Sequence, residues 1–169
     1  MLLTLDLGGS LGYGILFPND DIKLGCCKLV RGNIGGNRSP LPMVRLWHRL
    51  HRLVDYLPIT RIVFEETFAR GHAKHRLDQL QAVVMLFCVL NGIKFVRVSP
   101  TGWKKAVLGR NCSKAEYYEA ALLKFPHDCI LNDDMAAARW LIEYARPFIQ
   151  AADRKLSKTR KTRCKTRIN

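Results

Sequence analysis

The first thirty residues constrain the fold more than any other part of the chain. Residues 2–7, 11–17 and 22–30 form three short apolar stretches that are typical of β-strands. Gly8, Gly9 and Ser10 separate the first two stretches, and a Pro-Asn-Asp-Asp segment at 18–21 separates the last two. Because neither connection has room for a crossover helix, the pattern predicts an antiparallel three-stranded meander.

Helical periodicity dominates the chain after this meander. Apolar residues at helical spacing predict a helix that starts behind Ser39-Pro40 and that Pro58 ends, and others over 75–90 and 100–108. Ser113 with Glu116 predicts a capping box and a helix to about 125, and Asn132 is expected to cap a last helix that Pro147 bends or ends. Short strands at 62–65 and 94–98 lie between helices and should run parallel to the first strand. We therefore expect an α/β fold with a mixed five-stranded sheet between helical layers.

Charge divides the chain into two parts. Lys and Arg number 28 against 14 Asp and Glu, and eight of the cations fall in the last 16 residues, which hold no acid. We expect one domain over residues 1–152, then a basic tail over 153–169 that lacks fixed structure when free. The excess positive charge favours a polyanionic partner. The longest apolar run, 82–90, is too short to cross a bilayer, and Asp6 interrupts the apolar N-terminal stretch, so we expect a location in a cytoplasm, a nucleus or an organelle.

Acidic residues at three places in this cationic chain call for an explanation. Asp6 ends the first strand, Glu65 ends the fourth, and Asp133 and Asp134 open the last helix. If the two strands are parallel neighbours, their carboxyl ends place Asp6 beside Glu65, and carboxylates gathered that closely favour hard cations such as Mg²⁺. A plainer interpretation stays open, in which Asp6 is a turn residue and the aspartates complement the helix dipole.

Four stretches together resemble RuvC-like Holliday junction resolvases of the RNase H-like superfamily, including phage and viral types. The segment Leu5-Asp6-Leu7-Gly8-Gly9-Ser10 with Gly12-Tyr13-Gly14 is similar to the family's opening motif, with Leu7 in place of proline. Residues 63–68 resemble its second catalytic strand, and residues 98–109 with Ser113 and Lys114 resemble its lysine-bearing segment. Residues 133–138 resemble its final Asp-Asp motif. The resemblance spans most of residues 1–145.

The resemblance implies a metal-dependent nuclease site. Asp6, Glu65 and Asp134 would be the catalytic metal ligands for Mg²⁺ or Mn²⁺, with two ions expected, and Lys114 would stabilise phosphate. We prefer Glu65 to Glu66 because neighbouring strand residues point to opposite faces. The family's fourth carboxylate would fall at position 137, where this chain has Ala137, which we interpret as the replacement of an aspartate.

The same resemblance implies a partner, branched DNA in the form of four-way junctions. Phe68 would stack on unpaired bases, although a Phe packed into the core is the alternative. The candidate phosphate contacts are Arg70, Lys74, Arg76, Lys104, Lys105 and Arg110. A homodimer is expected, formed through the apolar segment 82–90. The predicted function is endonucleolytic resolution of Holliday junctions in DNA recombination and repair. Another RNase H-like flap or fork nuclease, or a catalytically silent junction-binding protein, remains the alternative.

Overall fold

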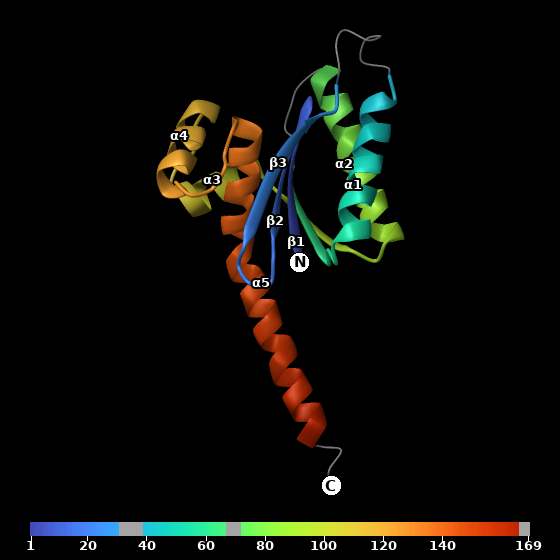
Figure 1. The fold of residues 1–169 in the computed structure, drawn as a ribbon, viewed down its shortest axis with the longest axis vertical. Helices are drawn as coiled ribbons and strands as arrows, with labels where there is room; N and C mark the ends of the chain where they lie inside the picture. The colour runs from blue at the N-terminus through green and yellow to red at the C-terminus, as the bar shows by residue number, and fades with distance from the viewer. Residues whose placement is uncertain (31–38, 67–71, 166–169) are drawn as a thin grey trace.

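A computed structural model describes the backbone of residues 1–30, 39–66 and 72–165, with side chains to residue 151 except 72, 73 and 150. Strands and helices follow one another in the order that the sequence predicts (Figure 1). The elements are β1 (Leu2–Leu7), β2 (Ser10–Leu16), β3 (Ile22–Lys28), α1 (Leu41–Tyr56), β4 (Arg61–Glu65), α2 (His72–Leu90), β5 (Lys94–Val98), α3 (Pro100–Leu108), α4 (Lys114–Lys124) and α5 (Asp133–Lys165).

The strands form one mixed sheet with the spatial order β3-β2-β1-β4-β5. β1, β2 and β3 pair antiparallel through their tight turns, whereas β4 pairs parallel with β1 and β5 pairs parallel with β4. The predicted meander and the predicted parallel pairing of the later strands are therefore confirmed. Parallel pairing of β1 with β4 places the carboxyl ends of both strands at the same edge of the sheet.

Helices cover both faces of the sheet (Figure 1). Leu3, Leu5 and Leu7 of β1 point into a core shared with α1 and α2. Leu2 of the same strand belongs to a second core, which contains Trp103 of α3 together with residues of α4 and α5. Because β1 is central, alternate residues on both of its faces are buried, and the expected α/β fold with two helical layers is confirmed.

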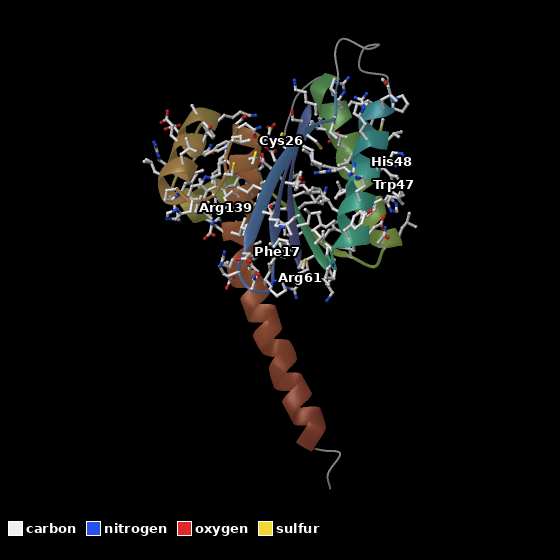
Figure 2. All side chains as sticks on the ribbon, viewed as in Figure 1. Phe17, Cys26, Trp47, His48, Arg61 and Arg139 are labelled. Carbon is white, nitrogen blue, oxygen red and sulfur yellow. The ribbon has the colours of Figure 1, made fainter. Side chains whose placement is uncertain are left out.

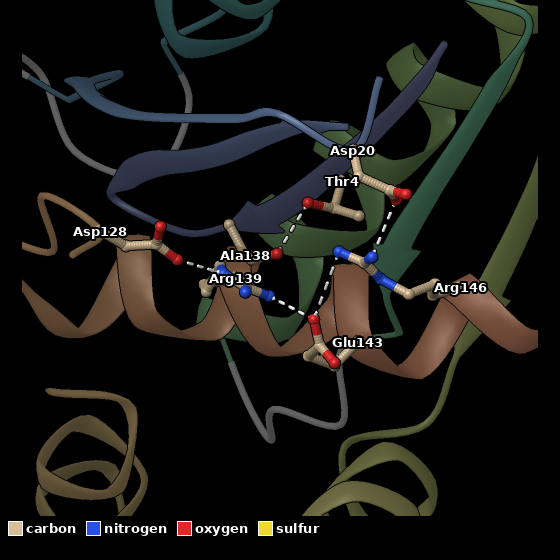
Figure 3. Close-up of polar contacts among 7 residues, drawn as sticks. All are labelled: Thr4, Asp20, Asp128, Ala138, Arg139, Glu143 and Arg146. Carbon is tan, nitrogen blue, oxygen red and sulfur yellow. Dashed lines mark hydrogen bonds and ion pairs between the residues drawn. The ribbon is translucent and has the colours of Figure 1, made fainter. Parts of the chain in front are cut away.

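Helix α5 lies unusually close to β1 and β2. The Thr4 hydroxyl, which is fully buried, lies 2.7 Å from the Ala138 carbonyl oxygen of α5 and 3.2 Å from that of Gly14 (Figure 3). A Cβ atom added at Gly12 would stand 2.1 Å from the backbone oxygen of Asp134. One added at Gly14 would stand 2.8 Å from Ile142. Glycine at positions 12 and 14 therefore permits a helix-to-sheet approach that any side chain would block.

Buried Arg139 ties α5 to the loop that precedes it. Its guanidinium donates to Asp128 at 2.5 Å and to Glu143 at 2.7 Å, and only 8% of its side chain is exposed (Figure 3). Arg146, two turns further along, pairs with Asp20 in the β2–β3 turn at 2.8 Å. Two carboxylates compensate the buried guanidinium, so this network fixes α5 against the lower half of the sheet.

Most predicted helix ends agree with the structure. Ser99 caps α3, Gly109 adopts a left-handed conformation after it, and Ser113 and Glu116 form the predicted capping box. The Asn132 side chain accepts from the Met135 amide at 2.9 Å and so caps α5 as predicted.

The expectation that Pro147 could end the last helix is wrong, because α5 continues to Lys165 (Figure 1). A proline removes a single amide donor from the helix, and the Ala, Lys and Arg residues that follow have high helix propensity. We expected no fixed structure after residue 152, whereas the backbone is helical to Lys165. Whether residues 153–169 act as a separate unit stays a prediction. No helix among the described residues is long and apolar enough to cross a membrane.

Gly12→Ala should destabilise the protein because its methyl group would collide with the backbone of α5. We expect a loss of about 1 to 3 kcal/mol in the free energy of unfolding, the usual cost of overpacking. Gly9→Ala is the matched control, since a Cβ there meets nothing within 4 Å. Urea denaturation of both variants measures the difference. Equal stability of the two variants would contradict the close approach of α5.

Candidate active site

Three acidic residues from three elements meet at one edge of the sheet. Asp6 is the penultimate residue of β1 and Glu65 is the last residue of β4. Leu5 pairs with Phe64 in the parallel register, so the next position brings Asp6 level with Glu65. Asp134 arrives from the first turn of α5, whose backbone lies against Gly12, the cross-strand partner of Asp6.

Asp6 is the electrostatic centre of this cluster. Burial, and after it the charges of Glu65 and Asp134, raise its pKa to about 8, while the charge of Lys114 opposes the rise. A carboxyl group at the end of a central strand loses hydration because strands flank it on both sides and α5 covers it. Its ionised form is therefore costly at neutral pH unless a cation compensates it.

Glu65 is held by the second core. Its Oε2 atom accepts a hydrogen bond of 2.8 Å from the indole Nε1 of Trp103, which is fully buried. Burial raises the Glu65 pKa, and the Trp103 hydrogen bond opposes that rise. The neighbouring Glu66 lies 3.6 Å from the guanidinium of Arg97 instead. The structure therefore brings Glu65 to the cluster and gives Glu66 a different partner.

Asp134 is held by β2 and β3. Its Oδ2 atom lies 3.8 Å from the thiol of Cys26 in β3, and its side chain also hydrogen-bonds to Ser10. Figure 2 places Cys26 between β3 and the upper part of α5. Burial and then the adjacent Asp133 raise the pKa of Asp134. Burial also raises the pKa of the Cys26 thiol, so this thiol remains protonated and can donate to the carboxylate.

Lys114 brings a positive charge to the edge of the cluster. It is the first residue of α4, and its Nζ atom lies 3.0 Å from Oδ2 of Asp133. That hydrogen bond raises the pKa of Lys114 and lowers the pKa of Asp133. Asp133 is therefore the ionised partner of the lysine, whereas the charge of Asp134 is one of those that raise the pKa of Asp6.

The donor set fits a hard divalent cation. Asp6, Glu65 and Asp134 supply carboxylate oxygens, the ligands that Mg²⁺ and Mn²⁺ prefer, and their raised pKa values reflect burial that cations would offset. Within the described parts of the chain, no three His, Cys, Asp or Glu side chains already form a compact group of metal ligands. The side chains would therefore have to close around an ion.

The predicted phosphate contacts lie in different surroundings. Lys105 on α3 and Lys74 on α2 are exposed, while Arg110 pairs with Glu116 at 2.9 Å. Lys104 turns inward, because its Nζ atom donates to the Cys112 carbonyl at 2.9 Å and lies over the rings of Trp103 and Tyr117. Arg76 of α2 is half-buried. Phe68 and Arg70 lie outside the described residues.

Ala137 follows Asp134 by three residues on α5 and is only 1% exposed. Residues three apart share a helix face, so position 137 lies one turn deeper along the face that carries Asp134. Its methyl group packs in the second core with other small side chains of α5. An alanine at this position supplies volume to the core and no ligand to the cluster.

Sequence reasoning missed two contacts that hold the cluster in place. Trp103 donates to Glu65 and Cys26 contacts Asp134, although each is distant in sequence from its partner. The helical spacing of α3 marks Trp103 as a core residue, but no pattern in the sequence shows which polar atom its indole meets. The alternation of β3 would have placed Cys26 and Cys27 on opposite faces.

No family model matches the sequence, and no curated protein is recognisably similar to it. Solved structures do match. The chain is similar to Thermus thermophilus RuvC with a TM-score of 0.66 and 12% identity, covering 89% of this chain and 96% of RuvC. The same enzyme in complex with a Holliday junction substrate matches with a TM-score of 0.64 and 13% identity, over 87% and 95% of the two chains.

A third match is the yeast mitochondrial Holliday junction resolvase Ydc2, with a TM-score of 0.54 and 16% identity over 85% of this chain and 76% of that one. Identities this low show a shared fold. The mixed five-stranded sheet, its helical layers and its strand order therefore give this chain the RuvC-like fold that the sequence motifs predict.

Proposed function

We propose that the chain is a structure-selective DNA endonuclease that resolves four-way junctions by metal-dependent hydrolysis of phosphodiesters. The observation that carries the proposal is the meeting of Asp6, Glu65 and Asp134, from three elements, at one edge of a RuvC-like sheet. A solved relative in fold was determined with a Holliday junction substrate, which supports branched DNA as the partner. The net charge of +14 suits a polyanion.

In this proposal the chain's own residues bind and orient the substrate. Asp6, Glu65 and Asp134 would hold Mg²⁺ or Mn²⁺. Two such ions would activate water and stabilise the leaving oxygen. Lys114 would exchange its contact with Asp133 for a DNA phosphate. Lys105, Lys74 and Arg110 would bind the DNA backbone outside the cluster, and Phe68 would stack on unpaired bases.

A dimer would match the substrate, because a four-way junction has near two-fold symmetry and resolution requires two nicks. The exposed face of α2 supplies a candidate interface. Leu86 is 54% exposed, Val89 70% and Leu90 65%, and with the exposed Ala82 they share one face of the helix. We propose that a second copy of the chain covers this apolar stripe.

Ala137 favours a second candidate function, a junction-binding protein that does not cut. A methyl group cannot ligate a cation, and losing one of four carboxylates would misplace a metal ion while lowering the negative charge beside the DNA.

Other branched substrates, such as flaps and forks, would use the same carboxylates. Competition of a four-way junction against forks and linear duplex for binding to the full chain distinguishes junction selectivity from general nuclease behaviour.

Ala137→Asp should raise metal-dependent nicking of a synthetic four-way junction by orders of magnitude. The new carboxylate would lie in a core position, so it should also lower the thermal stability of the metal-free protein. Added Mg²⁺ or Mn²⁺ should restore that stability. Gel assays over a range of metals measure the cleavage. A variant that binds junctions but cuts no branched DNA would favour the binding-only function.

Asp6→Asn should stabilise the metal-free protein at alkaline pH while abolishing cleavage. The folded-state pKa of Asp6, about 8, lies above its unfolded value near 3.8, so folding binds a proton between these values. The stability that this proton contributes is complete below about pH 4 and lost as pH rises through about 8. Asparagine removes that loss, which should add about 1 to 3 kcal/mol at pH 8.5, allowing for partial exposure of Asp6.

Denaturation curves in EDTA between pH 4 and 9 test this prediction for Asp6. Asp55→Asn, at the exposed end of α1, is the control and should follow the wild-type curve. Mg²⁺ should stabilise the wild type and the control at pH 8.5 but have little effect on Asp6→Asn. Parallel pH curves for wild type and Asp6→Asn would contradict the buried carboxylate cluster.

Leu86→Lys should convert the dimer to a monomer, because it places charge in the middle of the apolar stripe of α2. Leu123→Lys is the matched control, since Leu123 is 83% exposed on α4, on the other side of the sheet. Light scattering at micromolar concentration gives the mass of each protein. A monomeric wild type, both free and with junction DNA, would refute the dimer.

A further inference from the structure

The buried indole of Trp103 donates a hydrogen bond to the Glu65 carboxylate of the candidate site. We propose that Trp103 is a positioning residue for Glu65, whose indole N–H fixes the direction in which the carboxylate meets a divalent cation. The inference rests on the proposed metal-dependent function, and it assigns to α3 a task in the site besides carrying DNA-binding lysines.

The geometry of the contact is that of a strong, directed hydrogen bond. The Nε1 atom of Trp103 lies 2.8 Å from Oε2 of Glu65, and Trp103 is fully buried. An indole has one N–H group and no acceptor, so this donor can serve a carboxylate in only one orientation. Hydrogen bonds to an ionised acceptor are about twice as strong as those between neutral groups.

The indole ring is itself immobilised. Tyr117 of α4 packs edge-on against it, with ring centroids 5.8 Å apart. The ammonium of Lys104 lies 5.6 Å from the Trp103 ring centroid and 5.0 Å from that of Tyr117, and it also donates to the Cys112 carbonyl. Caps at both ends hold α3 in place, through Ser99 and Gly109. A donor on so rigid a support sets the position of its acceptor and does not follow it.

The contact also offsets the cost of burying Glu65. Burial raises the pKa of this carboxyl group, and the Trp103 hydrogen bond is the largest influence in the opposite direction, followed by Lys104 and Lys114. Trp103 therefore holds the Glu65 carboxylate in one orientation, as outer contacts of metal ligands commonly do.

Trp140 shows what a purely structural tryptophan looks like in the same core. It is 1% exposed, and its Nε1 atom donates to the backbone carbonyl of Tyr117 at 3.0 Å. Trp103 and Trp140 thus match in burial, core and hydrogen-bond length, and they differ in the acceptor. Phenylalanine at either position keeps most of the packing and removes one N–H donor.

Calorimetric titration of Mn²⁺ into the full chain tests the proposal with Trp103→Phe, Trp140→Phe, Glu65→Gln and the Trp103→Phe/Glu65→Gln double variant. Trp103→Phe should weaken Mn²⁺ binding by about 10- to 100-fold, the usual effect of losing an outer contact to a metal ligand. Trp140→Phe should bind Mn²⁺ as the wild type does. In the Glu65→Gln background, Trp103→Phe should add no further loss, because both changes act through the same side chain.

A measurement on the unmodified protein covers the case in which Trp103→Phe does not fold. The chain has three tryptophans, so indole N–H signals in ¹⁵N spectra can be followed during a Mg²⁺ titration. The Trp103 signal should shift as Mg²⁺ binds, while that of Trp47 on α1 should not. A wild type that binds neither ion refutes the proposed function and this inference with it. Metal binding that leaves the Trp103 signal unmoved, or unchanged affinity in Trp103→Phe, refutes the inference alone.

Discussion

The close packing of α5 against the first two strands is the constraint on which the rest of the structure depends. Glycines at positions 12 and 14 leave no side chain in the way, and the Thr4 hydroxyl donates to the Ala138 carbonyl of the helix. This contact sets how far the start of α5 reaches over the sheet edge. Asp134 can therefore meet a residue of β1 only because β2 offers bare backbone to the helix.

Burial and like charge then act together at that edge. Each strand carboxylate is covered by neighbouring elements, and this burial raises its pKa. The protein compensates with side-chain donors from outside the sheet, Trp103 for Glu65 and Cys26 for Asp134, and with one ammonium group from α4. The result is a set of acids brought to one sheet edge, whose side chains would still have to close around a cation.

Much of this could be predicted from the sequence because the signals are local. Tight turns specified the meander, and caps such as Ser113 specified where helices begin. The identity of the sheet edge followed from parallel pairing alone. Contacts between distant residues could not be predicted, since no local pattern relates Trp103 to Glu65 or Lys114 to Asp133. The prediction for the end of α5 was wrong because a single proline does not end a helix when residues of high helix propensity follow it.

The pairing of Lys114 with Asp133 has an electrostatic consequence for the order of events. With that lysine already engaged, the site presents an excess of carboxylates at the centre of a strongly basic protein. If the chain binds DNA as proposed, the surrounding basic surface would attract the DNA while the carboxylates would repel its phosphates, so docking and cleavage would be separate stages. Counter-ions that enter the centre would invert its local potential and admit the scissile phosphate. Free divalent ion concentration would thus act as a gate between a bound and a cutting complex.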